Sequence, residues 1–191
     1  MKTQKLLVIV AIVCLLVGAS SAAMARNDCP DGSITGGTFE EIVINEFESC
    51  KVVGVYVTER VIVNGADQFT MIGSLVNGNV RVINTKSAAL LDNHVDGGNL
   101  VARDNTFSTV LRNIVLGGTI RVIDDSGELE AQVLQNLIFN GNLRVNGHER
   151  ADVKENKVTD GDITCSDNDR LDSKDNDAIG GRVNCSRSLF N

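Results

Sequence analysis

The segment NHVDGGNLVAR (residues 93–103) returns four more times, in altered form, further along the chain. The later copies are NIVLGGTIRVI (113–123), NLIFNGNLRVN (136–146), NKVTDGDITCS (156–166) and NDAIGGRVNCS (176–186). Each copy begins with Asn, has Gly five residues later and continues into an alternating run; the copies start 20, 23, 20 and 20 residues apart. A period of this length is typical of solenoid proteins, in which each repeat is one coil of a stack.

The run after each glycine predicts a β-strand with one buried face, because apolar residues occupy every second position. The inward positions are Val80 and Val82, Leu100 and Ala102, Ile120 and Val122, Leu143 and Val145, Ile163 and Cys165, and Val183 and Cys185. Two more short apolar runs flank each Asn, so we expect three strands per coil. Such short strands can pair their backbone groups only by stacking coil on coil. The sequence therefore predicts an all-β parallel β-helix of about seven coils with ~20 residues each.

The repeated asparagines predict a ladder along one turn of the stack. They are Asn93, Asn113, Asn136, Asn156 and Asn176. We expect each Asn to adopt the left-handed backbone conformation that a sharp bend needs, which Asn tolerates better than most residues. Stacked side-chain amides can then hydrogen-bond from one coil to the next. One coil earlier, the spacing assigns Gly73 to the same column.

The cysteines test this register independently. Cys165 and Cys185 each follow the glycine of their repeat by four residues, so they are expected to face inward in adjacent coils. A separation of ~4.8 Å between neighbouring strands lies within the Cα distances that a disulfide accepts. Cys29 and Cys50 remain to form a second disulfide, and Cys14 lies in the N-terminal apolar segment.

This repeat pattern resembles the right-handed parallel β-helix of the pectate-lyase-like superfamily, whose coils also have three short sheets and often an Asn ladder. The resemblance covers roughly residues 54–185 and includes no catalytic motif. It implies that the outer face of the first sheet can hold a polysaccharide. It also makes a small lyase or epimerase acting on uronate polymers one possible function.

The two ends of the chain differ from the repeats. Residues 1–25 read as a signal peptide, with two lysines, a run of twelve apolar residues and small residues at the end. Such a run is too short to span a bilayer, so we expect no membrane span and a secreted or periplasmic protein. We expect a disulfide-tied cap at 26–50 and the β-helix at 51–191. The formal net charge of −7 argues against a nucleic-acid partner.

Four arginines are candidate ligand-binding residues. Arg81, Arg103, Arg121 and Arg144 are expected on the outer face of the strand that follows each glycine. Guanidinium groups at regular spacing suit the repeated carboxylates of an acidic polysaccharide. Arg is also a common choice for any exposed strand. No aromatic platform accompanies the four arginines, since the chain has one Tyr and no Trp.

Acidic residues recur at the turn after the arginine-bearing strand. Asp124 and Asp125, near Arg121 and Arg144, form the best local cluster. Stacked carboxylates could bind Ca²⁺, and an eliminating enzyme would need such acids with a nearby base. Turn preference explains the same residues without a metal. We therefore assign no metal site and keep Ca²⁺ as a possible cofactor.

An apolar patch is expected in the middle of the stack. Ile114, Leu116, Leu137 and Phe139 occupy the outward parity of the strand after the Asn, which suggests a contact surface for a partner protein or for a homo-oligomer. If the parity of this short strand is reversed, these residues are core instead. The two histidines, His94 and His148, are expected on the surface.

Two function classes remain open on this reading. The first is an exported, non-catalytic solenoid that binds a glycan or protein, or builds part of an envelope or matrix. The alternative is a small polysaccharide lyase or epimerase. The short chain lacks the long loops that usually wall a cleft, which favours the first class.

Overall fold

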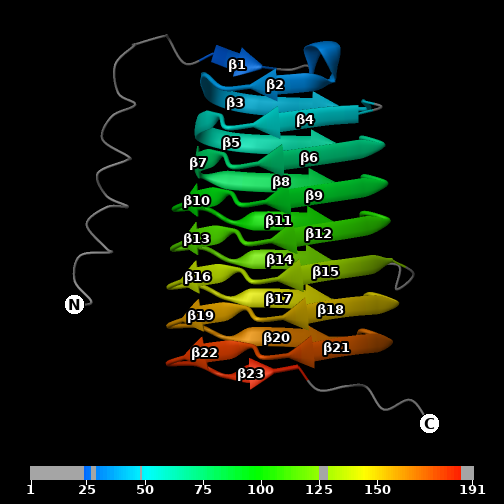
Figure 1. The fold of residues 1–191 in the computed structure, drawn as a ribbon, viewed down its shortest axis with the longest axis vertical. Coiled ribbons are helices and arrows are strands. Elements are labelled where there is room, and N and C mark those ends of the chain that lie inside the picture. The colour runs from blue at the N-terminus through cyan, green and yellow to red at the C-terminus, as the bar shows by residue number, and fades with distance from the viewer. Residues whose placement is uncertain (1–23, 27–28, 48, 125–128, 186–191) are drawn as a thin grey trace.

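The structure, a computed structural model, describes residues 24–26, 29–47, 49–124 and 129–185. Short parallel strands wind into coils that stack along one long axis, from β2 near the N-terminal end to β23 at the C-terminal end (Figure 1). The predicted fold is confirmed: the chain is an all-β solenoid of about seven turns with ~20 residues per turn.

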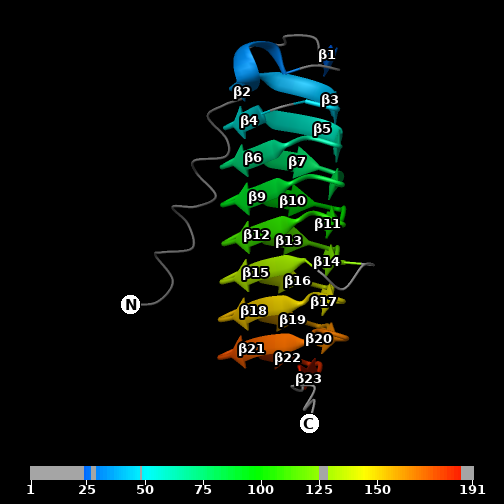
Figure 2. The same ribbon diagram turned by 90° about the vertical axis from the view of Figure 1, so that its right-hand side faces the viewer.

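Two sheets run along the stack, and Figure 2 shows their columns from the side. The eight-stranded sheet, here called sheet B, contains β2 (Ser33–Thr35), β4 (Ser49–Val53), β6 (Gln68–Ile72), β9 (Ser87–Leu91), β12 (Phe107–Leu111), β15 (Glu130–Leu134), β18 (Arg150–Lys154) and β21 (Arg170–Lys174). The fifteen-stranded sheet A carries two columns that meet at the long strand β5 (Tyr56–Asn64).

The first column of sheet A, here called the middle strands, contains β7 (Leu75–Asn77), β10 (His94–Asp96), β13 (Ile114–Leu116), β16 (Leu137–Phe139), β19 (Lys157–Thr159) and β22 (Asp177–Ile179). The second column, the arginine strands, contains β8 (Asn79–Ile83), β11 (Leu100–Arg103), β14 (Ile120–Ile123), β17 (Leu143–Asn146), β20 (Ile163–Ser166) and β23 (Val183–Asn184). Each full coil therefore runs from a sheet B strand to a middle strand and then to an arginine strand.

The N-terminal end joins the same two sheets. The strand β3 (Thr38–Asn45) pairs in parallel with β5 and with β1 (Met24–Arg26), and β2 pairs with β4. A 3₁₀ turn, η1 (Pro30–Gly32), precedes β2. Parallel pairing thus already begins within residues 26–50.

The core is built from the alternating residues that the sequence indicates. Val82, Ala102 and Val122 stack in register on successive arginine strands and are fully buried. The middle strands bury Val95, Val115 and Ile138 in the same way. At the C-terminal end Val183 is 45% exposed, because no further coil among the described residues covers it. The core is therefore one continuous column along the axis.

The repeated glycines allow close stacking of the coils. A Cβ at Gly118 would lie 1.8 Å from the carbonyl oxygen of Gly98, and one at Gly141 would lie 1.7 Å from that of Gly118. Real Cβ atoms do not approach so closely, so any side chain here would push neighbouring coils apart. Neither glycine has the positive φ that usually requires Gly, so the requirement at this turn is steric.

The predicted Asn ladder is present, but the left-handed backbone conformation lies at a different residue than expected. The amide N–H and the side-chain Nδ2 of Asn93 both donate to Oδ1 of Asn113, at 3.0 and 3.1 Å. Asn113 bonds in the same way to Asn136. The expectation that each Asn is left-handed is wrong: the residue before it takes that conformation, as at Arg112 with φ 54°. Asn is required here because its side chain satisfies buried groups in two coils.

The assignment of Gly73 to the ladder column is likewise wrong by one residue. Ser74 occupies the column, and its N–H donates to Oδ1 of Asn93 at 3.1 Å. A second set of side chains, on the turn before the arginine strands, works in the opposite axial direction: the N–H of Asn99 donates to Oδ1 of Asn79 at 3.0 Å. The spacing of the repeat did not predict this outer column.

Both predicted cysteine pairs lie at disulfide distance. The Cα atoms of Cys29 and Cys50 are 5.8 Å apart, and those of Cys165 and Cys185 are 4.5 Å apart. Such pairs indicate an oxidising, extracytoplasmic environment. No helix in the described part of the chain has the length and apolar character needed to cross a membrane.

Candidate functional site

The four candidate arginines fall into two neighbouring rows on the outer face of the arginine strands. Arg81, Arg121 and Arg144 share one register position, with Val101 between Arg81 and Arg121. Arg103 lies in the adjacent row, where its register partners are the apolar Ile83 and Ile123. The structure therefore divides the predicted stripe into a row of three arginines, here called the arginine row, and one separate residue.

The three arginines of the arginine row have no partner among the described residues. Arg81, Arg121 and Arg144 are exposed, and none makes a hydrogen bond or ion pair with another described residue. Arg103 differs, because its Nε lies 3.1 Å from Oδ2 of Asp104. Every outward position of β8, β11, β14 and β17 is occupied by Arg, Asn, Val or Ile. This face therefore presents positive charge on a protein that is acidic overall.

Asp124 does not extend this surface. It is 4% exposed, and its Oδ2 accepts a hydrogen bond from the N–H of Leu129 at 2.9 Å. The carboxylate thus closes the turn between β14 and β15, which contradicts its prediction as a surface ligand beside Arg121. Asp125, the other half of the predicted acidic pair, lies outside the described residues.

His148 corrects the expectation that both histidines lie on the surface. It is 2% exposed, and neither ring nitrogen makes a well-aligned hydrogen bond with a described residue. Burial lowers the pKa of His148, while the Asp124 carboxylate and nearby backbone groups partly oppose that change. His148 occupies a column that is also buried at Thr85, Asn105 and Asn168 in other coils, and this column becomes visible only once the coils are aligned. His94, by contrast, is only half-buried on β10.

The recurrent turn acids adopt conformations that explain their presence without a metal. Asp104 and Asp167 have φ values of 52° and 55°, in the left-handed region that Asp and Asn tolerate. Within the described ranges, no three His, Cys, Asp or Glu side chains come together as metal ligands. Ca²⁺ binding therefore stays a prediction from the sequence.

The predicted apolar patch faces outward. Ile114 is 37% exposed and pairs in register with Leu137, while Leu116 pairs with Phe139. The inward positions of these strands are the fully buried Val115 and Ile138 mentioned above. The alternative that the four patch residues form the core is thus wrong, and their use as an interface remains a prediction.

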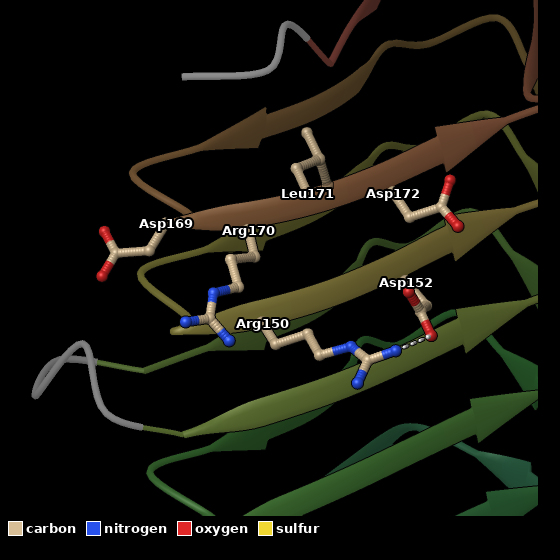
Figure 3. A pocket seen from close by; sticks show the side chains of 6 residues that line it. All are labelled: Arg150, Asp152, Asp169, Arg170, Leu171 and Asp172. Atoms are coloured by element: carbon tan, nitrogen blue, oxygen red, sulfur yellow. Dashed lines mark ion pairs between the residues drawn. The ribbon is translucent and has the colours of Figure 1, made fainter. Parts of the chain in front are cut away.

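A hollow of about 270 Å³ on sheet B was not anticipated from the sequence. Figure 3 shows its lining on β18 and β21, with Arg150 directed along its strand toward Asp152. The Nη2 of Arg150 lies 3.9 Å from Oδ2 of Asp152, and Lys154 pairs with Asp172. The equal spacing of Arg150 with Arg170 and of Asp152 with Asp172 is visible in the sequence. Because its charges compensate each other, this hollow is a weaker candidate than the arginine row.

Comparison with protein-family models, curated proteins and solved structures finds no match to this chain. The fold and the geometry above are therefore the basis for any statement about function.

Proposed function

We propose that this protein is an exported, non-catalytic β-solenoid whose arginine row binds an acidic polysaccharide. The observation that carries the proposal is the alignment of three exposed guanidinium groups, on Arg81, Arg121 and Arg144, that have no carboxylate partner in the part of the chain that the structure describes. Exposed, aligned cations on an otherwise acidic chain suit an external anion.

The spacing of the row suits an extended polymer that lies along the solenoid axis. Arg121 and Arg144 lie on adjacent strands, ~4.8 Å apart, and Arg81 lies two strand steps before Arg121. A guanidinium group can bind a carboxylate through two parallel hydrogen bonds, which fixes both distance and orientation. Since each exposed pair is worth only ~1 kcal/mol or less, useful affinity requires several contacts along one chain.

The non-catalytic part of the proposal follows from what surrounds the row. Its neighbours on the same face include Val101, Ile83 and Ile123, which cannot transfer protons or hold a cation, and Arg103, whose guanidinium group is paired with the Asp104 carboxylate. Of the two carboxylates that the sequence proposed, Asp124 is occupied inside a turn and Asp125 lies outside the described residues. A lyase or epimerase needs a base and usually a charge-stabilising group beside the substrate.

Calorimetric titration with polygalacturonate tests the proposal. We expect the double variant Arg121→Ala/Arg144→Ala to lose about ten-fold or more in affinity. Two of the three arginines that pair with ligand carboxylates are then absent. Arg150→Ala/Arg170→Ala, which removes the same charge from sheet B, should bind like the unmodified protein. Equal losses in both variants would show non-specific attraction and contradict the assigned site.

Further measurements distinguish ionic glycan binding from binding of an acidic protein and from lyase activity. Binding should weaken steeply with salt and be absent for a neutral polygalacturonate ester, because the contacts are ionic. Preferential binding of polyglutamate would favour an acidic protein partner over a glycan. Ultraviolet absorbance from unsaturated products, lost in Arg121→Ala, would instead establish the lyase alternative.

A further inference from the structure

The corner between sheet B and the middle strands carries a column of outward residues with an uneven distribution of size. In register order they are Gly36, Gly54, Gly73, Asp92, Arg112, Gln135, Glu155 and Asp175. The space above the first three is open, since a Cβ at any of these glycines would meet no atom within 4 Å. The corner column thus has no side chains over its first three coils and carries polar or charged side chains over the rest.

Apolar rows flank this column on both sides. The sheet B flank contains Val53, Ile72, Leu91, Leu111, Leu134, Lys154 and Lys174, in register from coil to coil. The flank on β5 and the middle strands contains Tyr56, Leu75, His94, Ile114, Leu137, Lys157 and Asp177. All the apolar members are partly exposed. The predicted patch residues Ile114 and Leu137 are therefore part of a longer apolar strip.

The centre of the corner column carries opposite charges. Nε of Arg112 donates to Oδ1 of Asp92 at 2.6 Å, and Nη2 donates to Oδ2 at 2.8 Å. Both side chains remain about half exposed, at 51% and 44%. Each charge therefore keeps an open side that a second partner can reach.

We propose that two copies of this chain pack antiparallel along this corner, with the two-fold axis between the coils of Asp92 and Arg112. Reversing the column places Asp92 opposite Arg112 of the other copy and Gly73 opposite its Gln135. Gly54 then receives Glu155, and Gly36 receives Asp175. Each glycine of one copy thus faces a long or charged side chain of the other copy. This is the self-complementarity that a two-fold interface requires.

The flanks support the same arrangement. On sheet B, Leu91 lies opposite Leu111 of the other copy, and Ile72 lies opposite its Leu134, so apolar groups bury each other. On the other flank Tyr56 lies opposite Lys157, a pairing in which the ammonium group can contact the ring.

Charge excludes the parallel alternative. If the two copies ran parallel, with the two-fold axis along the solenoid axis, Asp92 would lie against Asp92 and Arg112 against Arg112. Like charges in contact are unfavourable. The antiparallel arrangement instead joins two Asp and two Arg side chains in one alternating cluster. The eight positions of the column span ~34 Å, which gives the two copies a long line of contact. The arginine row lies two strands further along each coil and stays free in this dimer.

Sedimentation of charge-reversed variants tests the pairing. We expect a dimer for the unmodified protein and monomers for Asp92→Arg and for Arg112→Asp. Mixing the two variants should restore a dimer, because each then meets the opposite charge on its partner while the pair within each chain stays repulsive. A monomer for the unmodified protein at all concentrations, or single variants that remain dimeric, would overturn the proposal.

Cysteine cross-linking tests the antiparallel direction. Ile72 and Leu134 are three strand steps apart within one chain, ~14 Å, which is too far for a disulfide. The variant Ile72→Cys/Leu134→Cys should form a covalent dimer under mild oxidation, and Ile72→Cys alone should not. Absence of cross-links in the double variant would contradict the arrangement. Polygalacturonate binding by the monomeric variants separates failure of this proposal from failure of the arginine row.

Discussion

Single asparagines hold neighbouring coils together. Asn113 accepts the N–H of Asn93 and donates to the carbonyl of Leu90, and both groups are buried between coils. Removing the amide leaves several buried backbone groups without a partner, at roughly 1–3 kcal/mol for each. These side chains therefore act as part of the backbone hydrogen-bond system.

We expect Asn113→Ala to lower the free energy of unfolding by about 3 kcal/mol. Asn99→Ala provides the control, since Asn99 makes the equivalent bond to the N–H of Thr119 in the more exposed outer column. Water can replace that bond, so the loss should be below about 1 kcal/mol. Urea denaturation of both variants measures the difference; equal losses would show that ladder burial is unimportant.

The buried imidazole of His148 makes stability dependent on pH. The pKa of His148 is lower in the folded state than in the unfolded chain. At a pH below the ordinary histidine pKa of ~6.5, the unfolded chain therefore binds a proton more readily than the folded protein. Stability should therefore fall as the pH drops from about 7 to 5, by at most about 1.4 kcal/mol per pH unit from this group.

His148→Asn isolates that contribution. The N–H of His148 donates to Asn168, just as the N–H of Thr85 donates to Asn105 in an earlier coil, so Asn fits this column. The variant should lose less stability on acidification than the unmodified protein. Thermal unfolding at several pH values gives the comparison, and an unchanged slope in His148→Asn would refute the assignment.

Periodicity explains which residue-level predictions succeed. Inward residues such as Val122 and the pairing of Cys165 with Cys185 follow from the 20-residue step alone. Asp124 could not be placed, because it lies beside the insertion that breaks the period. His148 was missed because its column, buried also at Thr85 and Asn105, holds different residue types from coil to coil. The assignment of Gly73 to the ladder was wrong for another reason. The left-handed residue comes one position before the ladder residue in each coil, and spacing alone cannot resolve that offset.

At the scale of the strand, register decides which surface a residue joins. Alternation predicts that the candidate arginines point outward, but the stripe divides into two rows only when strands are aligned residue by residue. The hollow on sheet B and the corner column appear for the same reason. Each combines residues from several coils whose relation becomes visible only in the stack.

Close stacking of strands depends on the glycine turn. Gly118→Ala should destabilise the protein by about 2–3 kcal/mol or more, because its Cβ would collide with the carbonyl of the preceding coil. Gly117 is a neighbouring control with φ 69° and open space around it, so Gly117→Ala should cost about 1 kcal/mol of backbone strain. Urea midpoints give the order of the two variants. The reverse order would contradict the steric role of Gly118.

For the molecule as a whole, one rod presents two lengthwise surfaces of different chemistry. The arginine row offers exposed positive charge, and the corner between sheet B and the middle strands offers apolar rows around a charged centre. The two surfaces lie on different strands of each coil, so ligand binding and self-association can occur together. A dimer would carry two copies of the arginine row and so gain avidity for a long polymer.

The arginine row is the central functional assignment, and chemical-shift mapping tests it most directly. Addition of oligogalacturonate to isotope-labelled protein should shift resonances of Arg81, Arg121 and Arg144 together with backbone amides of β8, β14 and β17. Resonances of sheet B, including Arg150 and Arg170, should stay unchanged. Shifts confined to sheet B, or no shifts at a concentration where titration shows binding, would contradict the assignment.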